Sequence, residues 1–175
     1  MPINEFFGSA THMSSIYIET TIPSFYYTAR TDTQSLARMD WTREWWDTFS
    51  PKSELFSSAP VIVELERGTR EAEKNQRLAL IQGLELLEVT TEVREVARIY
   101  VEQLLMPQDA AGDALHLALA SYYGVDVLLT WNCKHLANPN KFGHINKVND
   151  ELQLAVPLLT TPLNYLSEDN SDDER

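Results

Sequence analysis

The sequence predicts a three-layer α/β/α sandwich built on a mainly parallel sheet, and two observations support this fold class. Short runs rich in apolar and β-branched residues alternate with longer segments of helical periodicity along the whole chain. In addition, residues 112–120 form an apolar helix that leads through Gly124 into the buried run 127–132, which is half of a βαβ unit. Crossover connections of this kind join parallel strands, so we expect helices on both faces of one sheet.

Proline and glycine mark the ends of the elements in the first half of the chain. Proline cannot donate to a sheet ladder or continue a helix, and glycine commonly follows the last turn of a helix. Pro23 is therefore expected to end the first strand, Pro51 the first helix and Gly68 the second helix. Ser58 can cap that second helix. The expected elements are strand 16–19, helix 35–49, strand 55–58 and helix 61–67.

Apolar periodicity defines the elements of the second half. Residues 92–106 repeat apolar side chains at i, i+3, i+4 and i+7, which predicts an amphipathic helix that Thr91 can cap. Pro107 ends this helix, and Asp109 is expected to cap the helix that follows. The expected elements are helices 69–82, 92–106 and 112–120, and strands 86–90, 127–132 and 155–160.

Composition indicates an ordinary folded domain of a reducing compartment. The single cysteine, Cys133, cannot form an internal disulfide, and no cysteine–histidine cluster suggests structural zinc. No apolar run approaches the roughly 20 residues that cross a bilayer. The first fifteen residues lack the basic and apolar regions of a signal peptide. We therefore expect a cytoplasmic protein without a membrane segment.

The chain is expected to contain one domain, residues 15–166, between two peripheral segments. Residues 1–14 are predicted to be a leader of low order, or an addition upstream of a natural start at Met13. Residues 167–175 carry five acids and one base and are predicted to be a disordered tail. The net charge of the whole chain is −12, so any attraction to a nucleic acid must be local.

Four polar residues lie where parallel strands of this fold would end. They are Glu19 after the first strand, Glu64 on the helix after the second, Asp113 before the fourth and Asn132 after it. Carboxyl ends of parallel strands meet at one edge of a sheet, where ligands bind. Carboxylates gathered there repel one another unless a cation joins them, and oxygen ligands favour Mg²⁺ or Mn²⁺. Such a metal activates water for phosphodiester hydrolysis.

Each of these residues also has a purely structural interpretation. Glu64 could be an exposed helix carboxylate, and Asp113 could be a charge that the helix macrodipole stabilises. His116, three residues after Asp113, is expected to be a core or supporting histidine and not a catalytic one.

Four short motifs occur in a fixed order. They are IYIETTIPS around Glu19, the E-x-x-x-G of residues 64–68, DALHLALA at Asp113 and LLTWNCKH at residues 128–135. Together they resemble the PIN-domain family, of which VapC-type ribonuclease toxins are the largest group. The resemblance spans residues 16–162. It implies a parallel-sheet α/β/α sandwich, Mg²⁺- or Mn²⁺-dependent endonucleolytic cleavage of RNA, a homodimer and an antitoxin partner.

The resemblance also assigns roles to residues. Glu19, Glu64 and Asp113 would bind the metal, and Asn132 would occupy the fourth position. Thr21 and Thr130 would support the site. Two residues depart from the family pattern, because the first acid is usually Asp and the fourth position is often Asp.

Cations that could guide RNA occur in two places. Arg67, Arg70, Lys74 and Arg77 are spaced to form one stripe if the helix continues across Gly68. Lys134 opens a basic island after the fourth strand. We predict RNA contacts from Arg67, Arg70, Lys74 and Lys134. The alternative is a solvated face with internal i, i+4 pairs, Glu66–Arg70 and Glu73–Arg77.

Three functions are compatible with these patterns. The first is a metal-dependent endoribonuclease that acts as the toxin of a toxin–antitoxin pair. The second is a PIN-like module with little or no activity that binds RNA or a protein. The third, a phosphotransferase with an Asp nucleophile, has less support, because the chain has no strand-end D-x-D and no Gly-rich phosphate loop.

Overall fold

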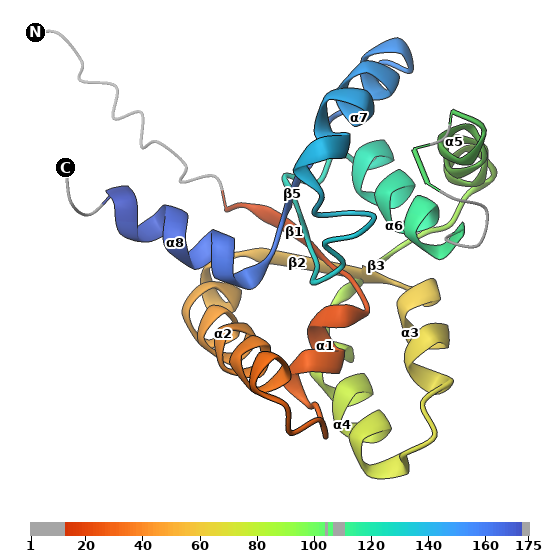
Figure 1. Cartoon of the computed structure of the whole chain (residues 1–175). Helices are drawn as coiled ribbons and strands as arrows, with labels where there is room; N and C mark the ends of the chain where they lie inside the picture. The colour runs from red at the N-terminus through yellow and green to blue at the C-terminus, as the bar shows by residue number, and fades with distance from the viewer. Residues whose placement is uncertain (1–12, 104, 107–110, 173–175) are drawn as a thin grey trace, which may run out of the picture.

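A five-stranded parallel sheet lies at the centre of the molecule (Figure 1). The structure is a computed structural model that describes residues 13–103, 105–106 and 111–172. Within these residues the strands are β1 (Ser15–Ile18), β2 (Glu54–Ser58), β3 (Glu85–Leu87), β4 (Val127–Leu129) and β5 (Leu158–Thr160). Their order in the sheet is β3-β2-β1-β4-β5, and each neighbouring pair is parallel. The predicted parallel sheet is therefore confirmed.

Helices cover both faces of this sheet. In the described residues they are α1 (Thr21–Tyr26), α2 (Thr33–Phe49), α3 (Ala59–Glu66), α4 (Glu71–Ile81), α5 (Thr91–Glu102), α6 (Ala111–Tyr122), α7 (Pro139–Glu151) and α8 (Pro162–Asp172), with a 3₁₀ turn at Ser50–Lys52. Figure 1 shows α5, α6 and α7 on one side of the sheet and α1, α2 and α4 on the other. This arrangement is the expected three-layer α/β/α sandwich.

The central strands form the core and bring the first acid to its place. Ile16, Tyr17 and Ile18 of β1 and Leu128 and Leu129 of β4 are fully buried. Parallel strands covered on both faces carry such uninterrupted apolar runs. Each buried aliphatic side chain contributes roughly 1.5–3 kcal/mol relative to its exposed state. The buried run fixes the register of β1 and places the next residue at the carboxyl edge of the sheet.

Three helices, α1, α7 and α8, were not expected from the sequence, and the end predicted for the first strand was wrong. Pro23 lies inside α1, where its missing N–H is harmless because the first helical turn has no acceptor for it. β1 ends before that proline, at Ile18. Helix α7 begins at Pro139, and the side chain of Asn138 caps it by accepting from the amide of Asn140.

The caps of the predicted helices also differ in detail. The Thr90 hydroxyl, and not that of Thr91, accepts from the amide of Val93 at the start of α5, and this helix ends at Glu102. Ser58 precedes α3 but its hydroxyl makes no capping bond, because it pairs with Tyr17 Oη at 2.7 Å. The predicted cap Asp109 lies outside the described residues.

The two peripheral segments predicted at the ends of the chain can be compared with the structure only in part. The boundary predicted at residue 167 falls within α8, which extends to Asp172. Most of the predicted leader, residues 1–12, lies outside the described residues. In the part of the chain that the structure describes, no helix combines the length and apolar character that a membrane span requires.

Candidate active site

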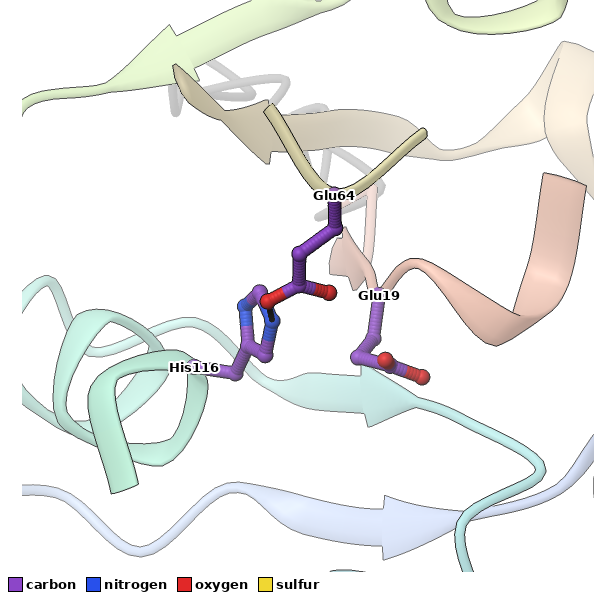
Figure 2. Close-up of side chains that lie close together, drawn as sticks. All are labelled: Glu19, Glu64 and His116. Atoms are coloured by element: carbon purple, nitrogen blue, oxygen red, sulfur yellow. Dashed lines mark hydrogen bonds and ion pairs between the residues drawn. The ribbon is translucent and has the colours of Figure 1, made fainter. Parts of the chain in front are cut away.

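Two carboxylates and an imidazole from three different elements meet beside the central strands (Figure 2). Glu19 directly follows β1, Glu64 lies on α3 after β2, and His116 lies on α6. Each offers an atom that lies within 4.8 Å of those of the other two. Polar residues far apart in sequence converge here because parallel strands deliver their carboxyl ends to one edge.

Hydrogen bonds hold the carboxylate of Glu19 in a buried position. Glu19 is only 3% exposed. Its Oε2 accepts from the Thr21 amide at 3.1 Å, the Thr21 hydroxyl at 2.5 Å and the Thr130 hydroxyl at 2.7 Å. The amides of Trp131 and Asn132 in turn donate to these two hydroxyls, at 2.7 and 2.9 Å. Burial raises the pKa of Glu19, although the charge of His116 and these bonds oppose that rise.

Glu64 is half-buried and has a partner on each oxygen. Its Oε2 accepts from the Thr20 hydroxyl at 2.5 Å, and its Oε1 lies 3.1 Å from His116 Nε2. Burial by itself would raise the pKa of Glu64, but the hydrogen bond and charge of His116, with the Thr20 bond, hold it below its ordinary value. Glu64 is therefore the more strongly acidic of the two carboxylates.

His116 is fully buried and hydrogen-bonded at both ring nitrogens. Nδ1 lies 2.7 Å from Tyr17 Oη, which also pairs with Ser58 Oγ, and Nε2 faces Glu64. Burial lowers the pKa of His116, but the bond to Glu64 and the nearby carboxylates raise it above its ordinary value overall. The hydrogen bond to Glu64 and the charges of the nearby carboxylates therefore stabilise the charged form of His116.

The direct contact of His116 with Glu64 was missed in the sequence. A signal was available, because His116 follows Asp113 by three residues and such residues share one face of a helix. Asp113 itself lies partly exposed in the first turn of α6 and does not belong to the three-residue cluster. Its charge is near enough to raise the pKa of His116.

The predicted fourth residue, Asn132, follows β4 at the same edge of the sheet. Its side-chain oxygen accepts from the amide of His135 at 3.0 Å and so stabilises the turn after the strand.

On the other side of the cluster, the start of α6 approaches α3 closely. A Cβ added at Gly112 would lie 3.1 Å from Glu64 Oε1. Any other residue at this position would make a tight contact that shifts Glu64 Oε1 by a few tenths of an ångström.

The expected stripe of cations is not formed, because the helix is not continuous across Gly68. Helix α3 ends at Glu66 and α4 begins at Glu71, so Arg67 does not share a helix with Lys74 and Arg77. The predicted i, i+4 pairs are also absent from the described ion pairs. Instead Arg70 pairs with Glu73 at 3.6 Å and Lys74 with Glu71 at 2.6 Å.

Two of the cations predicted to bind RNA line different hollows. Arg67 lines a hollow of about 650 Å³ together with Glu64 and Gly112. Arg70 lines a different hollow of about 780 Å³, whose wall includes Thr21. Lys134 is exposed in the turn after Asn132.

The donor atoms of the cluster fit a divalent cation. Glu19 and Glu64 supply carboxylate oxygens within the span of one ion, and carboxylates suit Mg²⁺ and Mn²⁺. His116 was not among the predicted ligands, and both of its ring nitrogens are engaged in hydrogen bonds with Tyr17 and Glu64. In the present arrangement it is directed at Glu64 and can orient that carboxylate.

The fold and the cluster together define a class, an α/β/α domain with a parallel 3-2-1-4-5 sheet and acids beside its central strand. The family model described as PIN domain matches residues 34–134, which is more than half of the chain. The chain therefore belongs to the PIN domain family. The match includes Glu64, Asp113 and Asn132, whereas Glu19 precedes it.

Solved structures of the same fold come from bacterial VapC proteins. VapC20 of Mycobacterium tuberculosis, a toxin that cleaves the sarcin-ricin loop, is 18% identical with a TM-score of 0.52, over 69% of this chain and 92% of its own. VapBC2 of Rickettsia felis, bound to a DNA fragment from its promoter, is 14% identical with a TM-score of 0.54, over 83% of this chain and 97% of its own. At these identities the likeness shows the fold alone. A comparison with curated protein sequences gives no match.

Proposed function

We infer that this protein is a metal-dependent endoribonuclease that hydrolyses RNA phosphodiester bonds. The observation that carries the inference is the convergence of Glu19, Glu64 and His116 at the carboxyl edge of a PIN-domain sheet. Two carboxylates held this close, one of them buried, are the arrangement that a divalent cation stabilises.

Glu19, Glu64 and Asp113 would hold Mg²⁺ or Mn²⁺, with the oxygen of Asn132 at the fourth position. When bound, the cation lowers the pKa of a water molecule and neutralises charge that develops on the phosphoryl oxygen. The chain's own contribution is preorganisation. Three donors fix Oε2 of Glu19, and Thr20 and His116 fix the two oxygens of Glu64.

We further infer that the enzyme is the toxin of a toxin–antitoxin pair. VapC20 is a toxin that cleaves RNA of the sarcin-ricin loop, and VapBC2 is bound to promoter DNA. A toxin of this kind would meet its RNA and a protein antitoxin in the cytoplasm. A homodimer is the assembly that the family resemblance implies.

A binding module with little or no activity is the second candidate. The observation that favours it lies at the fourth position, where an uncharged Asn132 stands and already bonds to the His135 amide. The first acid is also a Glu, which is one methylene longer than the usual Asp.

Cleavage of RNA by matched variants separates the two candidates. The purified chain should cleave RNA in Mn²⁺ or Mg²⁺ and lose this activity in EDTA. Glu64→Gln and Asp113→Asn should abolish cleavage with an unchanged fold, because each removes one negative charge at nearly constant shape. Arg98→Gln, an exposed change on α5, is the control and should cleave normally. Cleavage that persists in both acid variants would refute the assigned site. A fully folded but inactive wild type would instead support the binding module.

A further inference from the structure

Trp131 links the candidate active site to α2. It directly follows Thr130, whose hydroxyl donates to Glu19 Oε2 at 2.7 Å, and its own amide donates to the Thr21 hydroxyl at 2.7 Å. Its indole bonds to a different element, because Nε1 donates to Thr42 Oγ1 on α2 at 2.8 Å. One residue therefore joins the first acid to a helix that supplies no atom to the three-residue cluster.

The backbone after β4 orients the two hydroxyls that donate to Glu19. A threonine hydroxyl has a single proton, so an oxygen that accepts from an amide still directs its own proton to another acceptor. Thr21 Oγ1 accepts from the Trp131 amide and donates to Glu19 Oε2 at 2.5 Å. Thr130 Oγ1 accepts from the Asn132 amide at 2.9 Å and donates to the same carboxylate oxygen. A shift of this backbone would therefore disturb two of the three donors that hold Oε2.

Side chains of α1 and α2 hold the indole in place. Trp131 is only 7% exposed, and Thr42 is fully buried. The guanidinium of Arg38 lies 5.4 Å from the centre of the Trp131 ring and 5.1 Å from that of Phe25, and the Trp41 ring packs on the indole at 6.1 Å. The Thr42 hydroxyl donates its own proton to the Arg38 carbonyl at 2.6 Å, so toward the indole N–H it acts as an acceptor.

We propose that Thr42 and Trp131 are positioning residues that fix the carboxylate of Glu19 at the candidate metal site. This proposal rests on the proposed function, since the cation concerned is the one expected at the acids. The bond between Trp131 Nε1 and Thr42 Oγ1 holds the backbone after β4, this backbone orients two hydroxyls, and the hydroxyls hold Glu19 Oε2. Loss of the Thr42 hydroxyl would leave a buried N–H without its partner, which favours movement of the ring and of the backbone attached to it.

Calorimetric titration of the full chain with Mn²⁺ tests the role of the Thr42 hydroxyl. Thr42→Val removes the hydroxyl at nearly constant shape and should weaken Mn²⁺ binding by roughly fivefold, less than the roughly 10–100-fold typical of groups that bond directly to a metal ligand. Thr42→Ser keeps the hydroxyl and should bind Mn²⁺ as the wild type does. Tyr100→Phe is the matched control, because it removes an equally buried hydrogen bond, to Asn149 at 2.5 Å, between α5 and α7. This control should lower the thermal unfolding midpoint and leave the Mn²⁺ affinity unchanged.

Hydrogen exchange of the metal-free protein tests the same backbone without a cation. In EDTA the amides of Trp131 and Asn132 should exchange faster in Thr42→Val than in the wild type, and Thr42→Ser should restore the wild-type rates. Tyr100→Phe measures how far exchange accelerates through loss of stability alone. Trp131→Phe removes the N–H donor but keeps an aromatic ring and the backbone amide. It should reproduce the effect of Thr42→Val, and the double variant should add little to either single change, because both break one bond.

Wild-type Mn²⁺ affinity and wild-type amide exchange in folded Thr42→Val and Trp131→Phe would overturn the proposal. A Thr42→Ser variant as impaired as Thr42→Val would also overturn it, because the hydroxyl would then not be the group that matters. The two inferences fail separately. A wild type that binds no Mn²⁺, although its Trp131 and Asn132 amides respond to Thr42→Val, contradicts only the proposed function. Mn²⁺-dependent RNA cleavage with unchanged affinity and exchange in the variants contradicts only the positioning role.

Discussion

At the scale of single residues, the central feature is an imidazole that bonds directly to one carboxylate, Glu64, with a second carboxylate, Glu19, close by (Figure 2). The pKa of His116 is raised by Glu64 and the other acids against its burial, and that of Glu64 is lowered by His116 against its own burial. Each group therefore stabilises the charged form of the other in the absence of a metal. The hydrogen-bond network continues from His116 Nδ1 to Tyr17 Oη and from there to Ser58 Oγ.

The metal-free protein should lose stability as pH rises from about 6.5, the unfolded pKa of histidine. A raised folded pKa contributes stability below that value, and this contribution is lost as pH rises through the folded pKa. Glu19, whose pKa is also raised, acts in the same direction at lower pH. Glu64, whose pKa is lowered, loses its contribution only as pH falls below about 4.5.

Urea denaturation in EDTA between pH 5.5 and 8.5 measures this effect. His116→Gln should flatten the decline of the free energy of unfolding across the range, whereas His144→Gln, an exposed change on α7, should keep the wild-type slope. A wild-type slope in His116→Gln would mean that the imidazole titrates alike in the folded and unfolded chains.

At the scale of elements, the approach of α6 to α3 decides where Glu64 points. Gly112 permits this approach because an added Cβ would lie 3.1 Å from Glu64 Oε1. Gly143 in α7 is the natural comparison, since an added Cβ would meet no atom within 4 Å there. The two glycines therefore differ in their surroundings, because only at Gly112 would an added side chain press on a site residue.

Gly112→Ala should reduce RNA cleavage while leaving the fold intact, because the added Cβ would displace Glu64 Oε1 by a few tenths of an ångström. Gly143→Ala should leave cleavage unchanged and stabilise the protein by up to about 1 kcal/mol, the difference in helix propensity. Thermal unfolding and cleavage rates of both variants check the prediction. If Gly112→Ala cleaved RNA at the wild-type rate, the position of Glu64 would not limit activity.

Elements differ in how far the sequence predicts them. The strands and α5 were found because continuous apolar runs and the i, i+3, i+4 pattern report burial directly. Helix α1 is short, contains Pro23 and follows a strand almost directly. The local sequence pattern therefore predicted the end of a strand and not a helix. Helix α7 buries only Ile145, Val148 and Asn149, which is too little for a clear periodicity.

At the scale of the whole molecule, α8 closes the aromatic side of the core. Tyr165 packs edge-on against Phe49 and Trp45, with ring centroids 4.8 and 5.8 Å apart. The predicted domain boundary at residue 166 lies just after this contact. Residues 167–172 continue the same helix beyond it.

Truncation after Leu166 should therefore change the free energy of unfolding by less than about 1 kcal/mol, since the aromatic contact remains. Tyr165→Ala in the full chain should cost about 2 kcal/mol, because it opens space beside two large rings. Chemical denaturation of both proteins tests residues 15–166 as the folded unit. A larger loss on truncation than on Tyr165→Ala would place the stabilising contacts in the tail.

The sequence by itself determined the fold class, and it predicted that Glu19 and Glu64 lie close together at one edge of the sheet. It could do so because burial and strand order leave local traces in the apolar pattern and in the residues that end each strand. Only the tertiary structure decided how these residues meet. It placed His116 on Glu64, left Asp113 outside the three-residue cluster, and separated Arg67 from Arg70, which line different hollows. The physical reason is that such contacts depend on the angle between α3, α4 and α6. That angle is fixed by packing across the sheet, which no local stretch of sequence encodes.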